Sequence, residues 1–213
     1  MGENDHSKWD KKHMDPEFEL PEYPIPILED IIDSLPDGRA LDVATGTGRN
    51  AIYLADNGYT VDAVDVSDVG LREAQEKAKN TGVSVNWIQA DVIEYPLSDN
   101  SYSVITMSYF TALEMIPKLK DALEPGGYLI IELHLRTTDE IDYGPDDQKK
   151  RLRASELLHA CLDLTILHYS AHRRRSKDDT DKQNAVCTIV ARNTHGDTQS
   201  YPLWTDWSVS SNS

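Results

Sequence analysis

Short apolar stretches alternate with segments of helical periodicity along most of the chain. Residues 25–35 place apolar side chains at Ile27, Ile31 and Leu35, which predicts a helix, and the turn at 36–38 ends it. Seven apolar runs of strand length follow, and we predict strands at 39–44, 59–66, 83–90, 101–108, 128–135, 164–172 and 184–192. Further helices are predicted within 45–58, 67–82, 111–127 and 154–162.

The order of these elements predicts the fold class. Strands that alternate with helices favour a mostly parallel sheet with helices on both faces, so we predict a Rossmann-like, seven-stranded α/β fold. A charged loop at 173–183 joins the last two strands and is too short for a helical crossover, so the last strand is predicted to run antiparallel. A sheet of this kind binds its ligand beyond the carboxyl ends of its strands, and we expect the functional residues there.

The length of 213 residues fits a single domain. We assign residues 24–193 to this domain, residues 1–23 to a loose polar N-terminal arm, and residues 194–213 to a polar C-terminal tail without clear periodicity. The polar stretch at 137–150 interrupts the alternation of strands and helices and is predicted to form a flexible lid.

The charge of the chain excludes some partners. Lys and Arg number 21 and Asp and Glu number 37, which gives a net charge of −16. This charge repels phosphate backbones and anionic membrane surfaces, so we predict neither a nucleic-acid nor a membrane partner. The N-terminus lacks the apolar core of a signal peptide. Cys161 and Cys187 lie in apolar segments without the spacing of metal ligands, which favours buried thiols and a cytoplasmic location.

The strongest chemical signal is the segment DVATGTG at 42–48, between the first predicted strand and the following helix. Gly46 and Gly48 allow a sharp turn and the close approach of a ligand, and the free N–H groups at the start of the helix favour an anionic group. Such a turn alone is common among α/β folds. Asp42 adds information, because a carboxylate at the end of the first strand suits a cationic ligand group better than a pyrophosphate.

Two further acids follow the next two strands. Asp65 ends the second strand, where a carboxylate can accept both ribose hydroxyls, and Asp91 follows the third, where it can accept from an adenine amino group beside Val92. Each acid alone could instead cap the next helix or face solvent. It is improbable that acids after three successive strands all serve only as helix caps or solvent-exposed groups. We therefore predict that all three converge on a cationic adenosine derivative.

These motifs make a family resemblance visible. The stretch from Gly38 to Leu97 resembles the class I S-adenosylmethionine-dependent methyltransferases, whose first motif is an acidic residue followed by a glycine-rich turn. Ala44 stands where that family usually has its first glycine. The segment LEPGG at 123–127 resembles the turn before the family's fifth strand, and the resemblance covers roughly residues 24–193. Within the family, GTGRN and AVDVS look most like the small-molecule methyltransferases related to TehB of tellurite resistance.

The resemblance implies an enzyme that uses S-adenosyl-L-methionine to methylate a small-molecule acceptor. The glycine turn would hold the methionine end of the cofactor, and the later acids would hold its ribose and adenine. The implied cofactor-binding residues are Asp42, Ala44, Gly46, Gly48, Asn50, Asp65, Val66, Asp91, Val92 and Met107. Trp9 and Lys12 resemble an N-terminal segment that closes over the cofactor in some relatives.

The acceptor side gives weaker signals. The chain reads MSYF at 107–110, where enzymes acting on adenine or glutamine amides carry Asn/Asp-Pro-Pro-Tyr/Phe, which counts against those acceptors. Candidate catalytic residues at the carboxyl edge are Tyr109, His134, Arg136, His172 and Arg173. His168 and His172 lack a third ligand, so we predict no metal site. The arginines at 173–175 form either a solvated loop or an attraction for a small anionic acceptor.

Two other functions remain open at the level of sequence. Gly46, Gly48 and Ala51 also fit a loose dinucleotide fingerprint, so an NAD(P)-dependent oxidoreductase is one alternative. Asp42, Asp91 and the antiparallel last strand count against it. A non-catalytic protein that binds S-adenosylmethionine is the second alternative, and no feature of the sequence excludes it.

Overall fold

A computed structural model of the chain describes residues 3–16, 18, 20–142, 144–177, 181–194 and 201. The helices are α1 (Glu3–His13), α2 (Pro26–Ile31), α3 (Arg49–Asp56), α4 (Asp68–Thr81), α5 (Ile116–Ala122) and α6 (Glu156–Ala160). The strands are β1 (Arg39–Val43), β2 (Thr60–Asp65), β3 (Asn86–Gln89), β4 (Tyr102–Ser108), β5 (Leu123–His134), β6 (Thr165–Arg175) and β7 (Gln183–Arg192). Short 3-10 turns lie at Ile32–Ser34, Leu113–Met115 and Gln148–Lys150.

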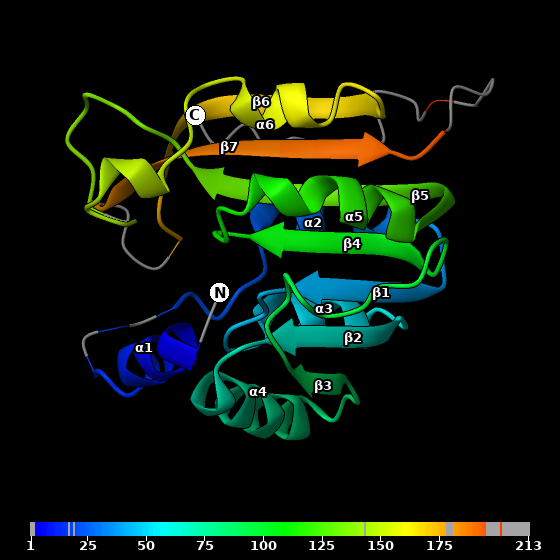
Figure 1. The fold of residues 1–213 in the computed structure, drawn as a ribbon, viewed down its shortest axis with the longest axis horizontal. Coiled ribbons are helices and arrows are strands. Elements are labelled where there is room, and N and C mark those ends of the chain that lie inside the picture. The colour runs from blue at the N-terminus through cyan, green and yellow to red at the C-terminus, as the bar shows by residue number, and fades with distance from the viewer. Residues whose placement is uncertain are drawn as a thin grey trace.

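One seven-stranded sheet joins the strands in the order β3-β2-β1-β4-β5-β7-β6. The pairs from β3 to β5 are parallel, whereas β7 runs antiparallel to both of its neighbours. The predicted α/β class, the seven strands and the reversed last strand are therefore confirmed. In Figure 1 the arrowheads of β1, β2 and β4 point toward the side on which α1 lies, which marks the carboxyl edge of the sheet.

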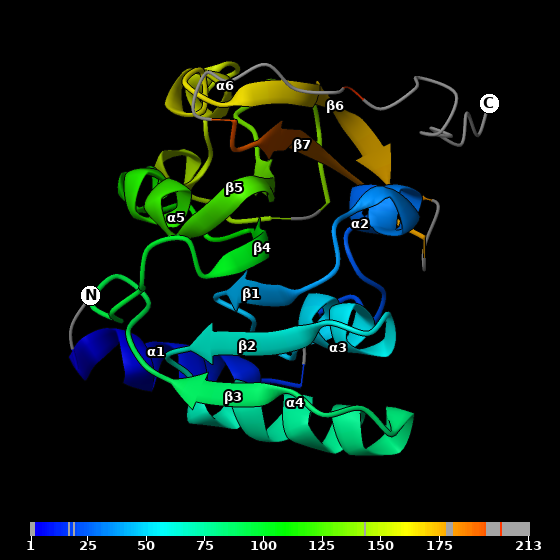
Figure 2. The same cartoon turned by 90° about the vertical axis from the view of Figure 1, so that its right-hand side faces the viewer.

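Helices cover both faces of the sheet (Figure 2). On one face, Leu119 of α5 packs into an apolar core that includes Ile105 of β4. On the other face, Leu28 of α2 and Leu54 of α3 share a second core with Val104. Neighbouring residues of β4 face opposite cores because side chains alternate along a strand. This double covering explains why the central strands read as continuous apolar runs.

The end of β6 differs from the prediction. Arg173–Arg175 pair with Gln183–Ala185 of β7, so these arginines continue the strand rather than form a loop. An edge strand tolerates charged side chains, because part of its surface stays in water. A prediction based on apolar residues could not find this extension of β6, because the three added residues are arginines.

The helix predicted at 111–127 is also shorter than expected. α5 spans Ile116–Ala122, and LEPGG at 123–127 forms the start of β5. Pro125 and two glycines disfavour helix, and Gly126 has a left-handed φ of +86°. The predicted turn before the fifth strand is thus part of the strand itself.

The N-terminal arm is not a loose segment, because residues 3–13 form α1 and this helix packs against α4. Its sequence has no apolar stripe, and polar contacts described below hold it in place, which explains why periodicity missed it. The predicted tail lies outside the described residues except for Thr194 and Tyr201. Within the described chain, no helix has the length and apolar character needed to cross a membrane. Cys161 and Cys187 are buried free thiols, as predicted.

Candidate functional site

The turn after β1 is built from left-handed residues. Ala44 has φ +53°, Gly46 has φ +57° and Gly48 has φ +80°. A Cβ on Gly48 would lie 2.7 Å from Cη2 of Trp87, so the close packing of this turn against β3 requires glycine. Ala44 adopts the same region with a side chain, at a cost of roughly 1–2 kcal/mol. The departure from the family's glycine therefore leaves the shape of the turn intact.

Asp42 lies near the end of β1 with only 1% of its surface exposed. Its Oδ2 accepts a hydrogen bond from the Thr45 hydroxyl at 2.5 Å, and its Oδ1 accepts one from the Thr106 hydroxyl at 2.7 Å. Burial raises the pKa of Asp42, while the two hydroxyl groups favour its charged form. A buried carboxylate at this edge favours a cationic group beside it.

Asp65, the last residue of β2, ties the glycine turn to the start of α4. Its Oδ2 accepts a hydrogen bond from the N–H of Gly46 at 2.7 Å, and its Oδ1 accepts one from the N–H of Ser67 at 2.8 Å. Burial raises the pKa of this carboxyl group. Because an ionised carboxylate offers about four acceptor positions, each oxygen retains capacity for a ligand hydroxyl.

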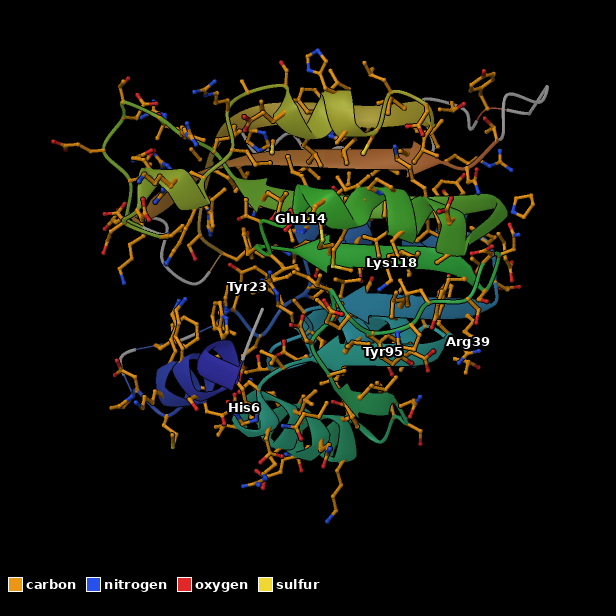
Figure 3. All side chains as sticks on the ribbon, viewed as in Figure 1. His6, Tyr23, Arg39, Tyr95, Glu114 and Lys118 are labelled. Atoms are coloured by element: carbon orange, nitrogen blue, oxygen red, sulfur yellow. The ribbon has the colours of Figure 1, made fainter. Side chains whose placement is uncertain are left out.

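Asp91 follows β3 and begins a tight turn. Its Oδ1 accepts a hydrogen bond from the N–H of Ile93 at 3.0 Å, so the acid also serves as a local cap. Lys118 on α5 fixes this turn by donating to the backbone oxygens of Ile93 and Tyr95 (Lys118 and Tyr95 are labelled in Figure 3). Val92 is buried within the same turn. The three acids thus lie after three adjacent strands at one edge of the sheet, as predicted from their spacing.

Helix α1 lies against this edge. Asp10 accepts hydrogen bonds from the Ser67 hydroxyl at 2.7 Å and from the N–H of Val69 at 3.3 Å, so a side chain of α1 helps to cap α4. A Cβ on Gly46 would lie 3.9 Å from Cε1 of His13. Burial lowers the pKa of His13. The N-terminal helix therefore lies against the start of α4 and beside the glycine turn.

Two further contacts describe how α1 sits. His6, labelled in Figure 3, lies with its Nε2 2.8 Å from the amide nitrogen of Gln89 at the end of β3. The ammonium group of Lys12 lies 4.8 Å from the ring centroid of Trp9 and 4.2 Å from that of Phe18. Trp9 and Lys12 thus belong to a helix on the predicted cofactor edge, although their contact with a cofactor stays a prediction.

Some implied cofactor residues have structural partners in the protein. The Asn50 side chain accepts from the N–H of Ile25 at 3.0 Å and donates to the Ser108 hydroxyl at 3.1 Å, so it joins three segments. Met107 is fully buried in the apolar core. Val66 follows Asp65 and is partly buried. Their contacts with a cofactor stay predictions.

Tyr109 follows β4 and is held by a buried ion pair. It has a left-handed φ of +58°, which is rare for a bulky residue and often marks a functional site. Its hydroxyl donates to Oε1 of Glu132 at 2.7 Å and accepts from Nη2 of Arg174 at 3.0 Å. Arg174 also donates two hydrogen bonds to Glu132, at 2.7 and 2.8 Å, and the Thr188 hydroxyl donates a further one at 3.0 Å.

His134 stacks on Tyr109, with ring centroids 4.4 Å apart and an interplanar angle of 23°. Its Nδ1 is buried and has no hydrogen-bond partner among the described residues. Burial, followed by the charge of Arg151, lowers the pKa of His134 to about 4. A Cβ on Gly144 would lie 2.9 Å from Nδ1, so the backbone of the 137–150 segment passes close over this ring. At neutral pH, His134 is therefore uncharged.

The other acceptor-side candidates support that covering segment or face solvent. Nε of Arg136 donates to the backbone oxygen of Arg151 at 2.8 Å, and Nε of Arg151 donates to the backbone oxygen of Pro145 at 2.7 Å. Arg173 lies 3.7 Å from Asp139 in an exposed ion pair. His172 is exposed on β6. The structure thus brings Tyr109 and His134 together but leaves Arg136, His172 and Arg173 outside their contact.

Three residues at this edge were missed by the sequence reasoning. Glu132 is the one charged residue of the apolar run at 128–135, and this signal was available. Arg174 can be placed only once β6 is known to extend through Arg175. Arg49 begins α3 directly after Gly48, and its guanidinium carbon lies 5.2 Å from the Tyr109 ring centroid. The described chain contains no cluster of three or more His, Cys, Asp or Glu residues suited to a metal ion.

Comparison with known proteins supports the family resemblance. Residues 40–127 match the family model described as a methyltransferase domain. The matched segment is less than half of the chain, so it shows what this part of the sequence is similar to. This confirms the resemblance seen in the glycine turn and the following acids. The matched residues of the methyltransferase domain include all three acids and end before Glu132 and Arg174.

Relatives of the domain are distant. A demethylmenaquinone methyltransferase of Renibacterium salmoninarum is 30% identical over 112 residues, which cover 49% of this chain and 45% of the relative. A structure from work on converting a disulfide bond into a thioacetal group during echinomycin biosynthesis has a TM-score of 0.70 at 17% identity, covering 91% of this chain and 94% of that one. TehB from Haemophilus influenzae has a TM-score of 0.63 at 19% identity, covering 78% and 61%. The chain spans less than half the length of the first curated relatives it matches.

Proposed function

We propose that this protein transfers the methyl group of S-adenosyl-L-methionine to a small-molecule acceptor. The observation that carries the proposal is the placement of Asp42, Asp65 and Asp91 after three adjacent strands, around a left-handed glycine turn, within a domain of the methyltransferase family. A cationic adenosine derivative suits this set of acceptors, because the three carboxylates would pair with its ammonium, ribose and adenine groups.

The chemistry of the residues fits the cofactor part by part. Asp42 is a buried carboxylate that suits an ammonium group, and Asp65 keeps acceptor capacity for two ribose hydroxyls. Asp91 and Val92 would hold the adenine. When bound, the cofactor supplies an electrophilic methyl group on a sulfonium. The protein's own part is to align the acceptor and to exclude water, and α1 already covers this edge.

Several features support a small acceptor rather than a polymer. The net charge of −16 disfavours nucleic acid, and the 137–150 segment leaves little room above His134. The relatives named as demethylmenaquinone methyltransferases act on small molecules by name. We also propose a cytoplasmic location, which the unpaired buried cysteines support.

Calorimetry tests the cofactor. We expect the protein to bind S-adenosylmethionine and to ignore NADH, which separates the methyltransferase from the oxidoreductase alternative. Asp65→Asn should weaken S-adenosylmethionine binding by about 1.5–3 kcal/mol, the range for hydrogen bonds to a charged group. Asp68→Asn, at the more exposed first residue of α4, is the matched control and should leave the affinity unchanged. Equal affinities in the two variants would remove Asp65 from the site.

A screen for methyl transfer tests the activity. The protein is incubated with methyl-tritiated S-adenosylmethionine and a set of thiols, carboxylates, phenols and quinols, and labelled products are counted. We expect at least one labelled product. Cofactor binding without any product across the set would favour the non-catalytic alternative.

A further inference from the structure

Among the described residues around Tyr109, one cation, Arg49, lies in contact with the ring without a carboxylate within ion-pair distance. We call Arg49, Tyr109, Glu132, His134 and Arg174 the acceptor cluster. Within it, Glu132 and Arg174 form a doubly hydrogen-bonded ion pair, so their charges cancel. Burial raises the pKa of Tyr109 and lowers that of His134 to about 4, so both rings are neutral at pH 7. The net charge of the acceptor cluster is therefore that of Arg49.

The guanidinium group of Arg49 has an unusual environment. It is partly buried and lies over the Tyr109 ring, and within the described chain it has neither an ion-pair partner nor a hydrogen-bond acceptor. Asp42 acts on it electrostatically, but the oxygens of Asp42 accept hydrogen bonds from Thr45 and Thr106. A guanidinium offers five N–H donors, and leaving them unpaired in a partly buried site is costly. An anionic ligand would satisfy them.

The position of Arg49 points to the acceptor rather than to a remote surface site. It directly follows the glycine turn, and Tyr109 directly follows the neighbouring strand β4. The buried Nδ1 of His134, which has no partner among the described residues, lies in the ring stacked on Tyr109. The Arg49 guanidinium and the His134 ring thus both contact the ring of Tyr109.

We propose that the methyl acceptor carries a negatively charged group, such as a carboxylate, that Arg49 binds beside the rings of Tyr109 and His134. This inference rests on the proposed methyltransferase function and narrows its substrate class. It also replaces the sequence-based hypothesis that the run at 173–175 attracts the acceptor. Arg174 is neutralised by Glu132, and Arg173 lies beside Asp139 in an exposed pair. In a protein of net charge −16, a local unpaired cation is the feature that can select an anion.

Matched ligand pairs test the charge preference without requiring turnover. The protein is saturated with S-adenosylhomocysteine, and calorimetry compares benzoate with benzamide and 3-mercaptopropionate with 3-mercaptopropionamide. In at least one pair, we expect the anion to bind about tenfold or more tightly than its amide, as a charge-assisted contact predicts. Arg49→Gln should abolish this preference, and Arg49→Lys should retain part of it. Arg72→Gln, at an exposed arginine of α4, should change nothing.

The outcomes separate this inference from the proposed function. If the wild type fails to bind S-adenosylhomocysteine and S-adenosylmethionine, the proposed function itself fails. If it binds them but shows no preference for the anion in either pair, the anionic acceptor is refuted while the function stands. A tenfold loss of S-adenosylhomocysteine affinity in Arg49→Gln would also overturn the inference, because Arg49 would then hold the carboxylate of the cofactor.

Discussion

Replacing Arg174 by Met tests how strongly the buried Glu132 carboxylate organises the acceptor side. Glu132 is 0% exposed and accepts four hydrogen bonds, two of them from Arg174. Each hydrogen bond to a charged group contributes about 1.5–3 kcal/mol, so two lost bonds amount to about 3–6 kcal/mol. Breaking a buried ion pair from one side costs about 3–5 kcal/mol. We expect the free energy of unfolding at pH 7 to fall by about 4 kcal/mol.

The same substitution should change the dependence of stability on pH. Burial alone would raise the pKa of Glu132, but the charge and hydrogen bonds of Arg174 outweigh it and hold the pKa below 4.5. In the wild type this group stabilises the fold above about pH 4.5 and loses its contribution as the pH falls further. Without Arg174, burial dominates, the folded state binds a proton more tightly than the unfolded chain, and lower pH becomes favourable. The difference between the two proteins should therefore shrink from pH 7 to pH 5.

Urea unfolding followed by circular dichroism at both pH values measures this difference. Arg175→Met, at the exposed next residue of β6, is the matched control and should cost less than about 0.5 kcal/mol. Combining Glu132→Gln with Arg174→Met removes the buried carboxylate charge that Arg174→Met leaves unpaired. The double variant should therefore recover part of the lost free energy of unfolding. A loss below about 1 kcal/mol in Arg174→Met, or the same loss at both pH values, would refute the reasoning.

Two other predictions concern the glycine turn and the buried histidine. Gly48→Ala should lower the free energy of unfolding by about 3 kcal/mol, because the new Cβ would clash with Trp87. Gly58 also has a left-handed φ but has open space around it, so Gly58→Ala should cost only about 1 kcal/mol. Thermal or urea unfolding measures both values. The pKa of His134 is about 4 in the folded protein and about 6.5 when unfolded, so stability should fall by up to about 3 kcal/mol as the pH drops between these values. His134→Phe should make the urea midpoint depend less on pH between about pH 4 and pH 6.5. An unchanged dependence on pH would contradict the lowered pKa of His134.

The placement of the three acids at one edge could be predicted from the sequence because each acid lies in a local motif at the end of a strand. Asp42, Asp65 and Asp91 each follow a strand, and parallel neighbouring strands bring their carboxyl ends to one edge. Gly46 and Gly48 directly predict the turn after β1. The strand pattern also sufficed for the reversed β7, since the connection before it is too short for a helix. α1 escaped prediction because Asp10 and His6 hold it through polar contacts, which leave no periodic apolar signal.

The acceptor side depends on long-range register. Arg174 reaches Glu132 across β7, and this contact exists only because the arginine run extends β6. Tyr109 and His134 both lie at this edge, their stacking depends on the left-handed backbone of Tyr109, and their role in catalysis stays a prediction. The periodicity of apolar residues predicts neither the extension of β6 by arginines nor the left-handed backbone of Tyr109.

The match to the methyltransferase domain ends at residue 127, so Arg49 and Tyr109 of the acceptor cluster lie inside the matched segment, whereas Glu132, His134 and Arg174 lie after it. The three acids proposed to hold the cofactor lie in the first half of the sequence, whereas three of the five residues of the acceptor cluster come from β5 and β6. If the proposed function holds, substitutions in these later strands should change the preference for the acceptor while the affinity for S-adenosylmethionine stays the same.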